Sequence, residues 1–516
     1  MITVPGTDMQ AWTHNVSAIE LVYRGANPNS AGCPWSESRC PVASIAANGT
    51  GGTAVTVAQP CAWNGNNKIH GRQALRVPAF VENVFELLGA KHGHPGEFYL
   101  DSAAGELYYV PHAGQDAKTT VGQLPILETL VDASGVSDVS HDGVAFELAT
   151  WMGPSRGGLG FVDVQGGFCM VCADGDPTCR GHSNAPIGPA GIRETPAALQ
   201  FTGATNVTFT NCSFSRLGSN AVGFSHGSHR NSVRRCSFDD ISASAVAIGT
   251  RSDPTKKTTP SQQEINNTVA DCVISRTAAE YRGHPGLSIG FSHGTRIEHN
   301  EIFNIPYTAV SLGWGWDTFP FTYDGDNHIV GNNIHHHMLL LGDGGAIYTL
   351  GPQGNMPFMQ SHFKNRSAIL PPSTQIGNWI HDGGPPWPVF LPGTNIPGVP
   401  GVPAPAPPSF DHDGIGQGHH QPGGLYSDTG TTNWNITGNV VQNVPNWLQG
   451  CRNVRIGPNW QDRNWFDAAS NLSINQMTKL CPLVGNVQLA SDKQADWPAA
   501  ARAVVAAAGP RDATIL

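Results

Sequence analysis

The sequence has few charged residues. Asp, Glu, Lys and Arg make up 13% of its 516 residues, about half the share of an average globular protein. Acidic residues outnumber basic ones, 39 to 29, which gives a formal net charge of −10. An acidic chain lacks the basic surface that nucleic acids and anionic membranes attract, so we expect neither as a partner.

Long apolar runs are also missing. No run of about 18 apolar residues is present, so we expect no transmembrane helix. The opening MITVPGTDMQAWTHNVSAIELVY has neither the basic start nor the apolar core of a signal peptide. It is typical of the middle of a β domain, so we expect either an intracellular protein or a chain without its opening segment.

The cysteines are many for a reduced cytosolic protein, and their number, 11, is odd. Two disulfides are plausible from their short range, Cys40–Cys61 and Cys451–Cys481. Cys169, Cys172 and Cys179 form another cluster in the predicted loop 166–194.

Cys169, Cys172 and Cys179 have the spacing CxxC-x6-C. A zinc site would need a fourth ligand, and the nearest candidate, His182, is not a clear one. A loop disulfide is therefore favoured over a metal, and we expect no metal and no cofactor.

One short phrase recurs seven times between residues 206 and 441. Each copy is a β-type run with a thiol or amide side chain at a fixed place: TFTNCSF (Cys212), SVRRCSF (Cys236), TVADCVI (Cys272), RIEHNEI (Asn300), HIVGNNI (Asn332), TQIGNWI (Asn378) and NITGNVV (Asn439). A small-apolar, Gly-rich phrase follows each of the first six copies. Such self-similarity indicates a solenoid, in which each unit buries its apolar side only against its neighbours.

The spacing of the marked residues favours a right-handed parallel β-helix. The intervals are 24, 36, 28, 32, 46 and 61 residues, and a coil of short strands tolerates such insertions because its turns project outward. No long stretch with a 3.6-residue period crosses the region, which excludes helical repeats. Equivalent residues should stack about 4.8 Å apart, Cys on Cys and Asn on Asn, with the Asn at left-handed bends.

The fold class is therefore all-β, with three predicted parts. Residues 1–125 form an N-terminal β-rich domain. Residues 126–455 form the β-helix, with a Pro-rich insertion at 385–422. Residues 456–516 form a C-terminal tail, whose short Ala-rich helix we expect to cap one end of the stack.

Two aspartates are the candidate catalytic residues. Asp343, in LGDGGAIYTLG, stands just before a predicted strand, and Asp428, in GGLYSDTG, just after the equivalent strand of the next turn. On adjacent turns the two acids can face one groove, and a pair of carboxyl groups is what glycosidic cleavage requires. Alternatively, an Asp in a Gly-rich turn forms the turn or binds calcium. Asp382 is interpreted as a corner residue of this kind.

Aromatic and His residues near these acids are candidates for substrate binding. Thirteen Trp and 21 His favour a carbohydrate ligand, because flat aromatic side chains stack on sugar rings. Trp314 and Trp316 alternate with glycines, so both point the same way. His335 is expected to orient Asp343 or to bind a sugar hydroxyl. The predicted substrate-binding set is Trp314, Trp316, His335, Tyr348, His284 and His293.

The chain resembles the secreted right-handed β-helix proteins of glycoside hydrolase family 141. The resemblance rests on GEFYLDSAAGELYYVP, GFSHGTRIEHNEIFNIPYTAVSLGWGW, LGDGGAIYTLGPQ and GGLYSDTG, and it extends from about residue 17 to 508. It implies activity on α-L-fucose in pectin or on xylan, with Asp343 and Asp428 as the catalytic pair. The family's Y-L-D-E-G motif reads Tyr426-Ser427-Asp428-Thr429-Gly430 in this chain.

Three functions fit these observations. The first is a glycoside hydrolase acting on a cell-wall polysaccharide, extracellular or in the cell envelope and monomeric. The second is a polysaccharide lyase or epimerase, which needs a cation and often a Lys or Arg base. Against it, Lys256, Lys257 and Lys364 lie in predicted loops, although Arg276, Arg282 and Arg296 remain as candidate bases. The third is a non-catalytic glycan-binding surface protein.

Overall fold

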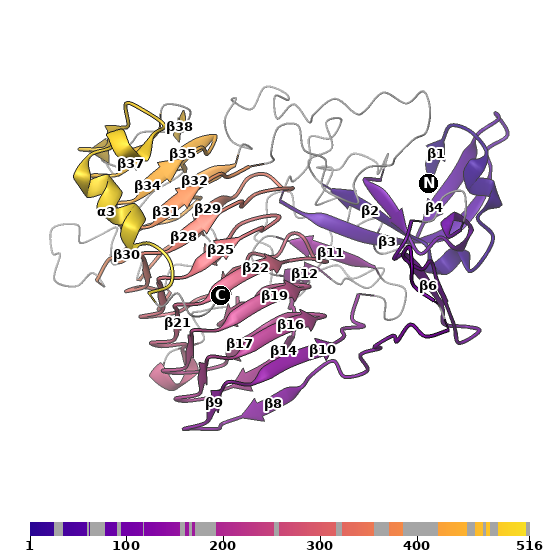
Figure 1. The fold of residues 1–516 in the computed structure, drawn as a ribbon, viewed down its shortest axis with the longest axis horizontal. Helices are drawn as coiled ribbons and strands as arrows, with labels where there is room; N and C mark the ends of the chain where they lie inside the picture. The colour runs from indigo at the N-terminus through magenta and orange to yellow at the C-terminus, as the bar shows by residue number, and fades with distance from the viewer. Residues whose placement is uncertain are drawn as a thin grey trace.

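The computed structural model describes residues 1–24, 35–58, 61, 78–89, 94–116, 118–154, 160–164, 168–170, 192–251, 257, 259–315, 322–354, 371–384, 422–450, 460–467, 471–474 and 483–511. Three long parallel sheets wind into a coil, and a smaller antiparallel sheet lies beside it (Figure 1). Each turn of the coil contributes one strand to each sheet, so strands paired in a sheet come from successive turns. This is the parallel β-helix that the repeated phrase predicts.

The three sheets each contain ten strands and are named after their first strand along the chain. The β8 sheet consists of β8 (Val131–Ser134), β14 (Ala197–Thr202), β17 (Asn220–Ser225), β20 (Val246–Ile248), β23 (Leu287–Ile289), β26 (Val310–Leu312), β29 (Gly345–Thr349), β32 (Gly423–Ser427), β35 (Asn446–Gly450) and β38 (Asn471–Ile474). The β9 sheet consists of β9 (Ser140–Asp142), β15 (Thr208–Thr210), β18 (Ser232–Arg234), β21 (Thr268–Ala270), β24 (Arg296–Glu298), β27 (His328–Val330), β30 (Ser373–Ile376), β33 (Trp434–Thr437), β36 (Trp460–Asp462) and β39 (Leu483–Val484). The β10 sheet consists of β10 (Ala145–Ala149), β16 (Ser213–Leu217), β19 (Ser237–Ile241), β22 (Val273–Thr277), β25 (Glu301–Phe303), β28 (Asn333–His335), β31 (Trp379–His381), β34 (Val440–Gln442), β37 (Trp465–Phe466) and β40 (Val487–Gln488).

Stacked apolar side chains fill the interior of the coil. In the β10 sheet one inward position is Phe in the early turns and Ile in most later ones, and its members are Phe146, Phe214, Phe238, Ile274, Ile302, Ile334, Ile380, Val441 and Phe466. The rings of Phe214 and Phe238 lie parallel, with centroids 4.5 Å apart. Burying each such side chain contributes about 1.5–3 kcal/mol, so the column holds successive turns in register.

The marked residues of the repeat form a ladder at one corner of the coil. Cys212, Cys236 and Cys272 are buried free thiols, as predicted. From Asn300 onward each side-chain amide donates to the next side-chain carbonyl, at 2.8–3.0 Å, through Asn332, Asn378, Asn439, Asn464 and Asn486. The last two members were not recognised in the sequence.

The left-handed residue of this corner is not the ladder residue itself, which corrects the sequence analysis. It is the residue directly before it, for example Asp271 (φ 55°), His299 (φ 53°) and Gly331 (φ 63°). This position turns the chain, and the following Asn can then hydrogen-bond the next turn with its side chain.

The N-terminal sheet draws strands from two distant parts of the chain. Its strands are β1 (Ile2–Val4), β2 (Glu20–Arg24), β3 (Glu37–Ala47), β4 (Thr53–Val57), β5 (Phe80–Glu82), β11 (Phe161–Val164), β12 (Phe168–Met170) and β13 (Ile192–Glu194), and a separate hairpin joins β6 (Phe98–Asp101) to β7 (Glu106–Tyr109). Strand β11 pairs with β3. The chain therefore leaves the coil after β10 and returns to the first sheet. The predicted loop 166–194 contains two of its strands, and the boundary at residue 125 does not separate the two units.

A disulfide joins Cys40 to Cys61, with an S–S distance of 2.09 Å, and confirms the first predicted pair. The other pair, Cys451–Cys481, lies outside the described residues, as do Cys172 and Cys179 and all of the Pro-rich insertion except Pro422. None of the helices in the described ranges is long and apolar enough to cross a membrane.

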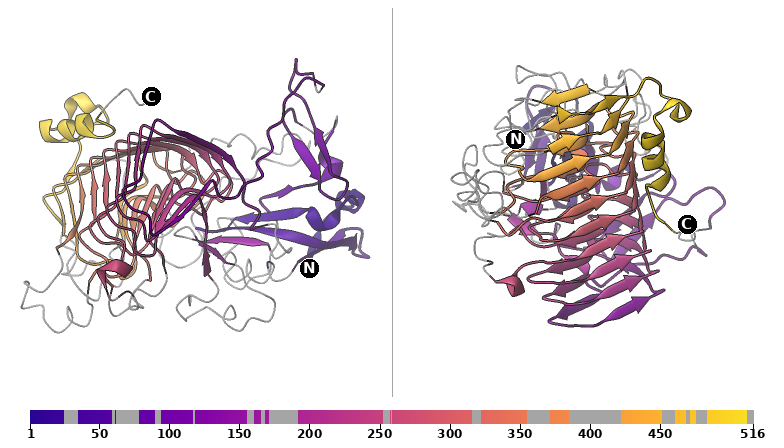
Figure 2. Two further views of the ribbon diagram at one scale, coloured as in Figure 1. Left: turned by 90° about the horizontal axis from the view of Figure 1, so that it is seen from below. Right: turned by 90° about the vertical axis from the view of Figure 1, so that its left-hand side faces the viewer.

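The C-terminal helix α3 (Ala499–Ala507) lies along the side of the coil (Figure 2). Ala501 and the preceding Trp497 pack on Val440 of β34, between the partly buried Trp379 of β31 and Trp465 of β37. These three contacts come from adjacent strands on the outer face of the β10 sheet. The prediction that the helix caps an end is therefore wrong, because its apolar stripe matches this row on the side.

Candidate active site

The β8 sheet turns alternate side chains into and out of the coil. Ile347 of β29 and Leu425 of β32 belong to the interior, so Tyr348 and Tyr426, which pair in register beside them, point outward. The same outward position in successive turns holds Gln200, Gly223, Ala247, Ser288, Ser311, Tyr348, Tyr426 and Gln449. Within this row, four small residues from Gly223 to Ser311 precede the two large aromatic ones.

Each tyrosine holds one of the predicted catalytic aspartates. The Tyr348 hydroxyl donates to Asp428 Oδ2 at 2.6 Å, and the Tyr426 hydroxyl donates to Asp343 Oδ1 at 2.8 Å. The two rings meet edge to face, with centroids 5.1 Å apart. The two carboxylates are therefore connected through a pair of packed tyrosines on one outer face.

Both tyrosines stay protonated under physiological conditions. They are 1% and 2% exposed, and burial, followed by the charge of the aspartates beside them, raises the pKa of Tyr348 and of Tyr426 well above 10. Each hydroxyl is thus a permanent donor to its carboxylate. This arrangement fixes where each carboxylate points.

Asp428 is fixed by further donors on the loop after β32. The backbone N–H and the hydroxyl of Thr429 donate to Asp428 Oδ1 at 2.6 and 3.1 Å. Thr429 stands where the Y-L-D-E-G motif has its Glu. The substitution therefore lies in direct contact with the candidate catalytic carboxylate.

Asp343 occupies a left-handed position (φ 55°) in front of β29 and is half-buried. Its carbonyl accepts from the Tyr307 hydroxyl at 3.1 Å. A Cβ on Gly344 would lie 2.7 Å from the Tyr307 ring and 2.6 Å from the Thr308 hydroxyl. Glycine is therefore required after Asp343, because the loop packs directly on the preceding turn.

Trp314 does not present the open face of the predicted sugar platform. Trp314 is 5% exposed, and the Arg251 guanidinium lies over its ring, 5.7 Å from the centroid. Arg251 also donates to Ser288 Oγ at 2.5 Å. The face of Trp314 is thus occupied by a protein cation, and Trp316 lies outside the described residues.

His284 is a structural residue at the junction of the coil with the N-terminal sheet. It is fully buried, with Nδ1 2.8 Å from Asp163 Oδ1 of β11 and Nε2 2.8 Å from Thr195 Oγ1. The expectation that it contacts substrate is wrong, because both ring nitrogens are used inside the protein.

His335 does not orient Asp343, whose carboxylate is held by Tyr426. It stacks between Phe303 and His381 on the outer face of the β10 sheet, with ring centroids 4.9 and 4.8 Å away. Its Nε2 lies 3.3 Å from Glu301 Oε1.

Two other predicted residues lie at corners of the coil. His293 is half-buried at the turn between the β8 and β9 sheets, bridged to Ile265 and Gly325. Asp382 has φ 50° and accepts from Asn443 Nδ2 at 2.6 Å, which fits its interpretation as a corner residue.

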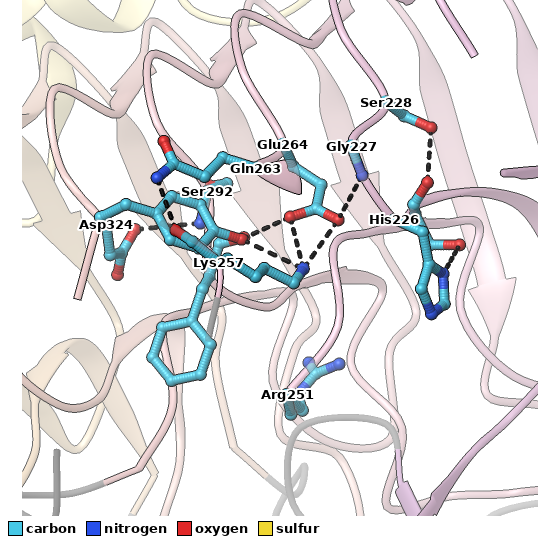
Figure 3. A network of polar contacts seen from close by, with 12 residues as sticks. His226, Gly227, Ser228, Arg251, Lys257, Gln263, Glu264, Ser292 and Asp324 are labelled. Atoms are coloured by element: carbon cyan, nitrogen blue, oxygen red, sulfur yellow. Dashed lines mark hydrogen bonds and ion pairs between the residues drawn. The ribbon is translucent and has the colours of Figure 1, made fainter. Parts of the chain in front are cut away.

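A buried polar network lies beyond the C-terminal ends of β17, β20 and β23 (Figure 3). Lys257 Nζ lies 2.9 and 3.0 Å from the two carboxylate oxygens of Glu264, and the Tyr323 hydroxyl hydrogen-bonds both Glu264 and the Phe291 carbonyl. Lys257 is 8% exposed. Its ammonium group is therefore engaged in the buried ion pair with Glu264 and is not exposed at the surface as a candidate base.

Known proteins share this architecture. Residues 192–334 match the family model described as a right-handed beta helix region. The chain has the right-handed parallel β-helix fold.

The structural comparison extends over the whole chain. A solved structure named "Glycoside hydrolase" superposes with a TM-score of 0.65 at 20% identity, covering 100% of this chain and 74% of that one. PfbA, a surface adhesin of Streptococcus pneumoniae, aligns with a TM-score of 0.28 at 10% identity, over 68% of this chain and 69% of its own. No curated protein sequence matches the chain.

The sequence singled out Asp343 and Asp428, and Tyr348 as a substrate-binding residue, whereas Tyr348 is buried and donates to Asp428. It did not single out Tyr426, Tyr307 or Arg251. Tyr426 could have been found, because YTLG and YSDTG place a tyrosine at the same position of two successive turns. Among the described residues, no group of three or more His, Cys, Asp or Glu side chains is arranged to hold a metal ion.

Proposed function

We propose that the protein is a glycoside hydrolase of the family 141 type, in which Asp343 and Asp428 cleave a glycosidic bond. The observation that carries this proposal is the pair of packed tyrosines, each donating to one of these carboxylates on the same outer face of the coil. One carboxyl group protonates the leaving oxygen, and the other acts as nucleophile or activates water.

The contacts of the two acids suggest how the roles divide. Asp428 accepts three hydrogen bonds, from Tyr348 and from the N–H and hydroxyl of Thr429. A carboxylate held only as an acceptor suits the nucleophile or base. Asp343, half-buried beside Tyr426, is then the acid.

The proposed substrate is a cell-wall polysaccharide of the xylan or fucosylated pectin type, outside the cell or in its envelope. The family resemblance supports this class, and the solved glycoside hydrolase with the same architecture is consistent with it. We propose that the enzyme acts as a monomer.

The test is turnover of xylans, pectins and fucosylated oligosaccharides by the wild-type protein and by Asp343→Asn and Asp428→Asn. Each variant should lower kcat by about 10²–10⁴-fold, the usual contribution of a general acid or base. Asp382→Asn is the matched control, because it changes an acid of the same coil whose carboxylate interacts with Asn443 and His381, and kcat should stay within about twofold. Equal activity of all four proteins would refute the assignment.

The same assay separates hydrolysis from the alternatives. A lyase would give an unsaturated product that absorbs in the ultraviolet, whereas hydrolysis gives new reducing ends alone. The ion pair of Lys257 with Glu264 argues against the lyase. A glycan-binding protein would retain its ligand in both Asn variants and show no turnover in any of them.

A further inference from the structure

A cavity lies between the N-terminal sheet and the coil. It has a volume of about 1290 Å³. One side is formed by β2, β3, β5 and the β6–β7 hairpin, and the other by the turns that follow β22, β25 and β28. Nothing in the proposed catalytic chemistry uses the groups on the first side.

Two carboxylates face each other in this cavity. Glu20 of β2 and Glu82 of β5 are directly paired across the sheet, so their side chains lie on the same face. Like charges in this position are unfavourable. Arg39 offsets this repulsion. It forms an ion pair with Glu82 and donates to the Glu280 carbonyl at 2.8 Å, and its charge also favours the ionised form of Glu20.

Glu20 is left with a carboxyl group that has no hydrogen-bond donor among the described residues. Burial raises the pKa of Glu20 to about 7, against the opposing effect of Arg39, and Glu82 and Glu280 raise it further. The Glu20 side chain is half-buried in the wall of this cavity. Such a group lining a cavity is therefore available to a ligand.

The cavity adjoins the loop of the candidate acid. Pro306 and Leu340 line it on the coil side. Tyr307, next to Pro306, donates to the Asp343 carbonyl at 3.1 Å, and Leu340 lies in the segment that leads to Asp343. The segments that line the cavity therefore also contact the Asp343 loop, although Asp343 itself is not part of the lining.

The lining selects the kind of sugar. Its basic side chains already pair with acids: Arg39 with Glu82, Arg282 with Glu37 and Arg276 with Asp239. An anionic uronate would face carboxylates, whereas a neutral sugar can donate its hydroxyls to them. The apolar lining residues Leu87 and Leu340 suit the C–H faces of the ring.

We propose that this cavity is a subsite for neutral sugar residues, in which the Glu20 carboxylate accepts hydrogen bonds from their hydroxyl groups. The proposal rests on the proposed function, because the subsite extends the glycan path from Asp343. It assigns binding to the N-terminal sheet and bond cleavage to the coil.

The experiment uses the full chain carrying Asp343→Asn and Asp428→Asn, so that bound glycan is not consumed. Calorimetric titration is carried out with xylohexaose, a fucosylated xyloglucan oligosaccharide and hexagalacturonate. Adding Glu20→Gln should weaken binding of the neutral probe by about tenfold, the loss of charge-assisted hydrogen bonds. Leu340→Trp, which fills the cavity from the coil side, should weaken it similarly. The matched control is Glu106→Gln, a neighbouring carboxylate outside the cavity that accepts from Tyr108, and it should leave the affinity unchanged.

The proposal is overturned if Glu20→Gln and Leu340→Trp bind like the parent, if hexagalacturonate binds most tightly, or if no neutral probe binds. It is also overturned if Glu20→Gln, introduced into the wild-type protein, abolishes kcat at saturating substrate, because Glu20 would then act in the reaction. Weakened binding without turnover by the wild-type protein would refute the hydrolase and retain the subsite.

Discussion

The coil and the N-terminal sheet are both β structures, but different interactions hold them. The coil repeats one pattern of inward apolar residues and corner amides, so neighbouring turns supply nearly all of its contacts. The N-terminal sheet pairs strands as distant as β3 and β11 and faces the coil with charged residues such as Glu20, Arg39 and Glu82. The repetitive unit provides a rigid scaffold for the aspartates, and the irregular one provides a polar wall beside them.

The largest expected difference between the two units is their response to pH. His337, in the coil, is fully buried against the Gly423 carbonyl, and burial lowers its pKa to about 3. The unfolded chain has a His pKa of about 6.5 and so binds the proton first. The contribution of neutral His337 to the free energy of unfolding is therefore complete above pH 6.5. It is lost as the pH falls toward 3, by up to about 5 kcal/mol.

Glu20, in the N-terminal sheet, should show the opposite sign. Its folded pKa of about 7 exceeds the value of 4.5 for an unperturbed Glu. Stability is therefore complete below pH 4.5 and falls as the pH rises through 7. The free energy of unfolding in urea should be measured between pH 4 and 8. In His337→Gln it should fall less toward acid pH than in the wild-type protein, and in Glu20→Gln it should fall less toward neutral pH. His336→Gln, an exposed neighbour, is the control. A pH dependence of the unfolding free energy that is unchanged in His337→Gln and Glu20→Gln would contradict the expected difference between the two units.

A smaller effect is expected within the corner ladder. Asn378→Ala leaves buried partners on both adjacent turns, Asn332 and Asn439, without their hydrogen bonds. The cost should be about 1–3 kcal/mol of unfolding free energy. Cys236→Ala, at the same corner, removes only a weak thiol contact and should cost less than half as much. Similar losses in the two variants would mean that packing, and not the amide ladder, holds this corner.

The coil could be predicted because its information is local and repeated. A strand of three to five residues with a marked corner residue is visible in each phrase, and stacking follows from the repetition. The pairing of β3 with β11 could not be predicted, because no periodic pattern connects segments so far apart. The two units had to be seen together before the cavity at Glu20 became visible.

The candidate site was only partly predictable for the same reason. Asp343 and Asp428 stand out because their loops are Gly-rich and follow the repeat. The expectations that His284 contacts substrate and that His335 orients Asp343 were wrong, since a sequence does not show which side chains another unit buries or which sheet carries a residue. Trp314 belongs to the same packed cluster as Tyr348 and Tyr426, but the sequence gives no sign that Arg251 covers its ring.

The most direct measurement is a crystal structure of the full chain carrying Asp428→Asn with a bound neutral oligosaccharide that the wild-type protein cleaves. The account predicts that the scissile linkage lies between the side chains at positions 343 and 428, and that a neighbouring sugar hydrogen-bonds Glu20. An oligosaccharide bound away from both aspartates, or with its scissile oxygen out of reach of either side chain, would contradict it.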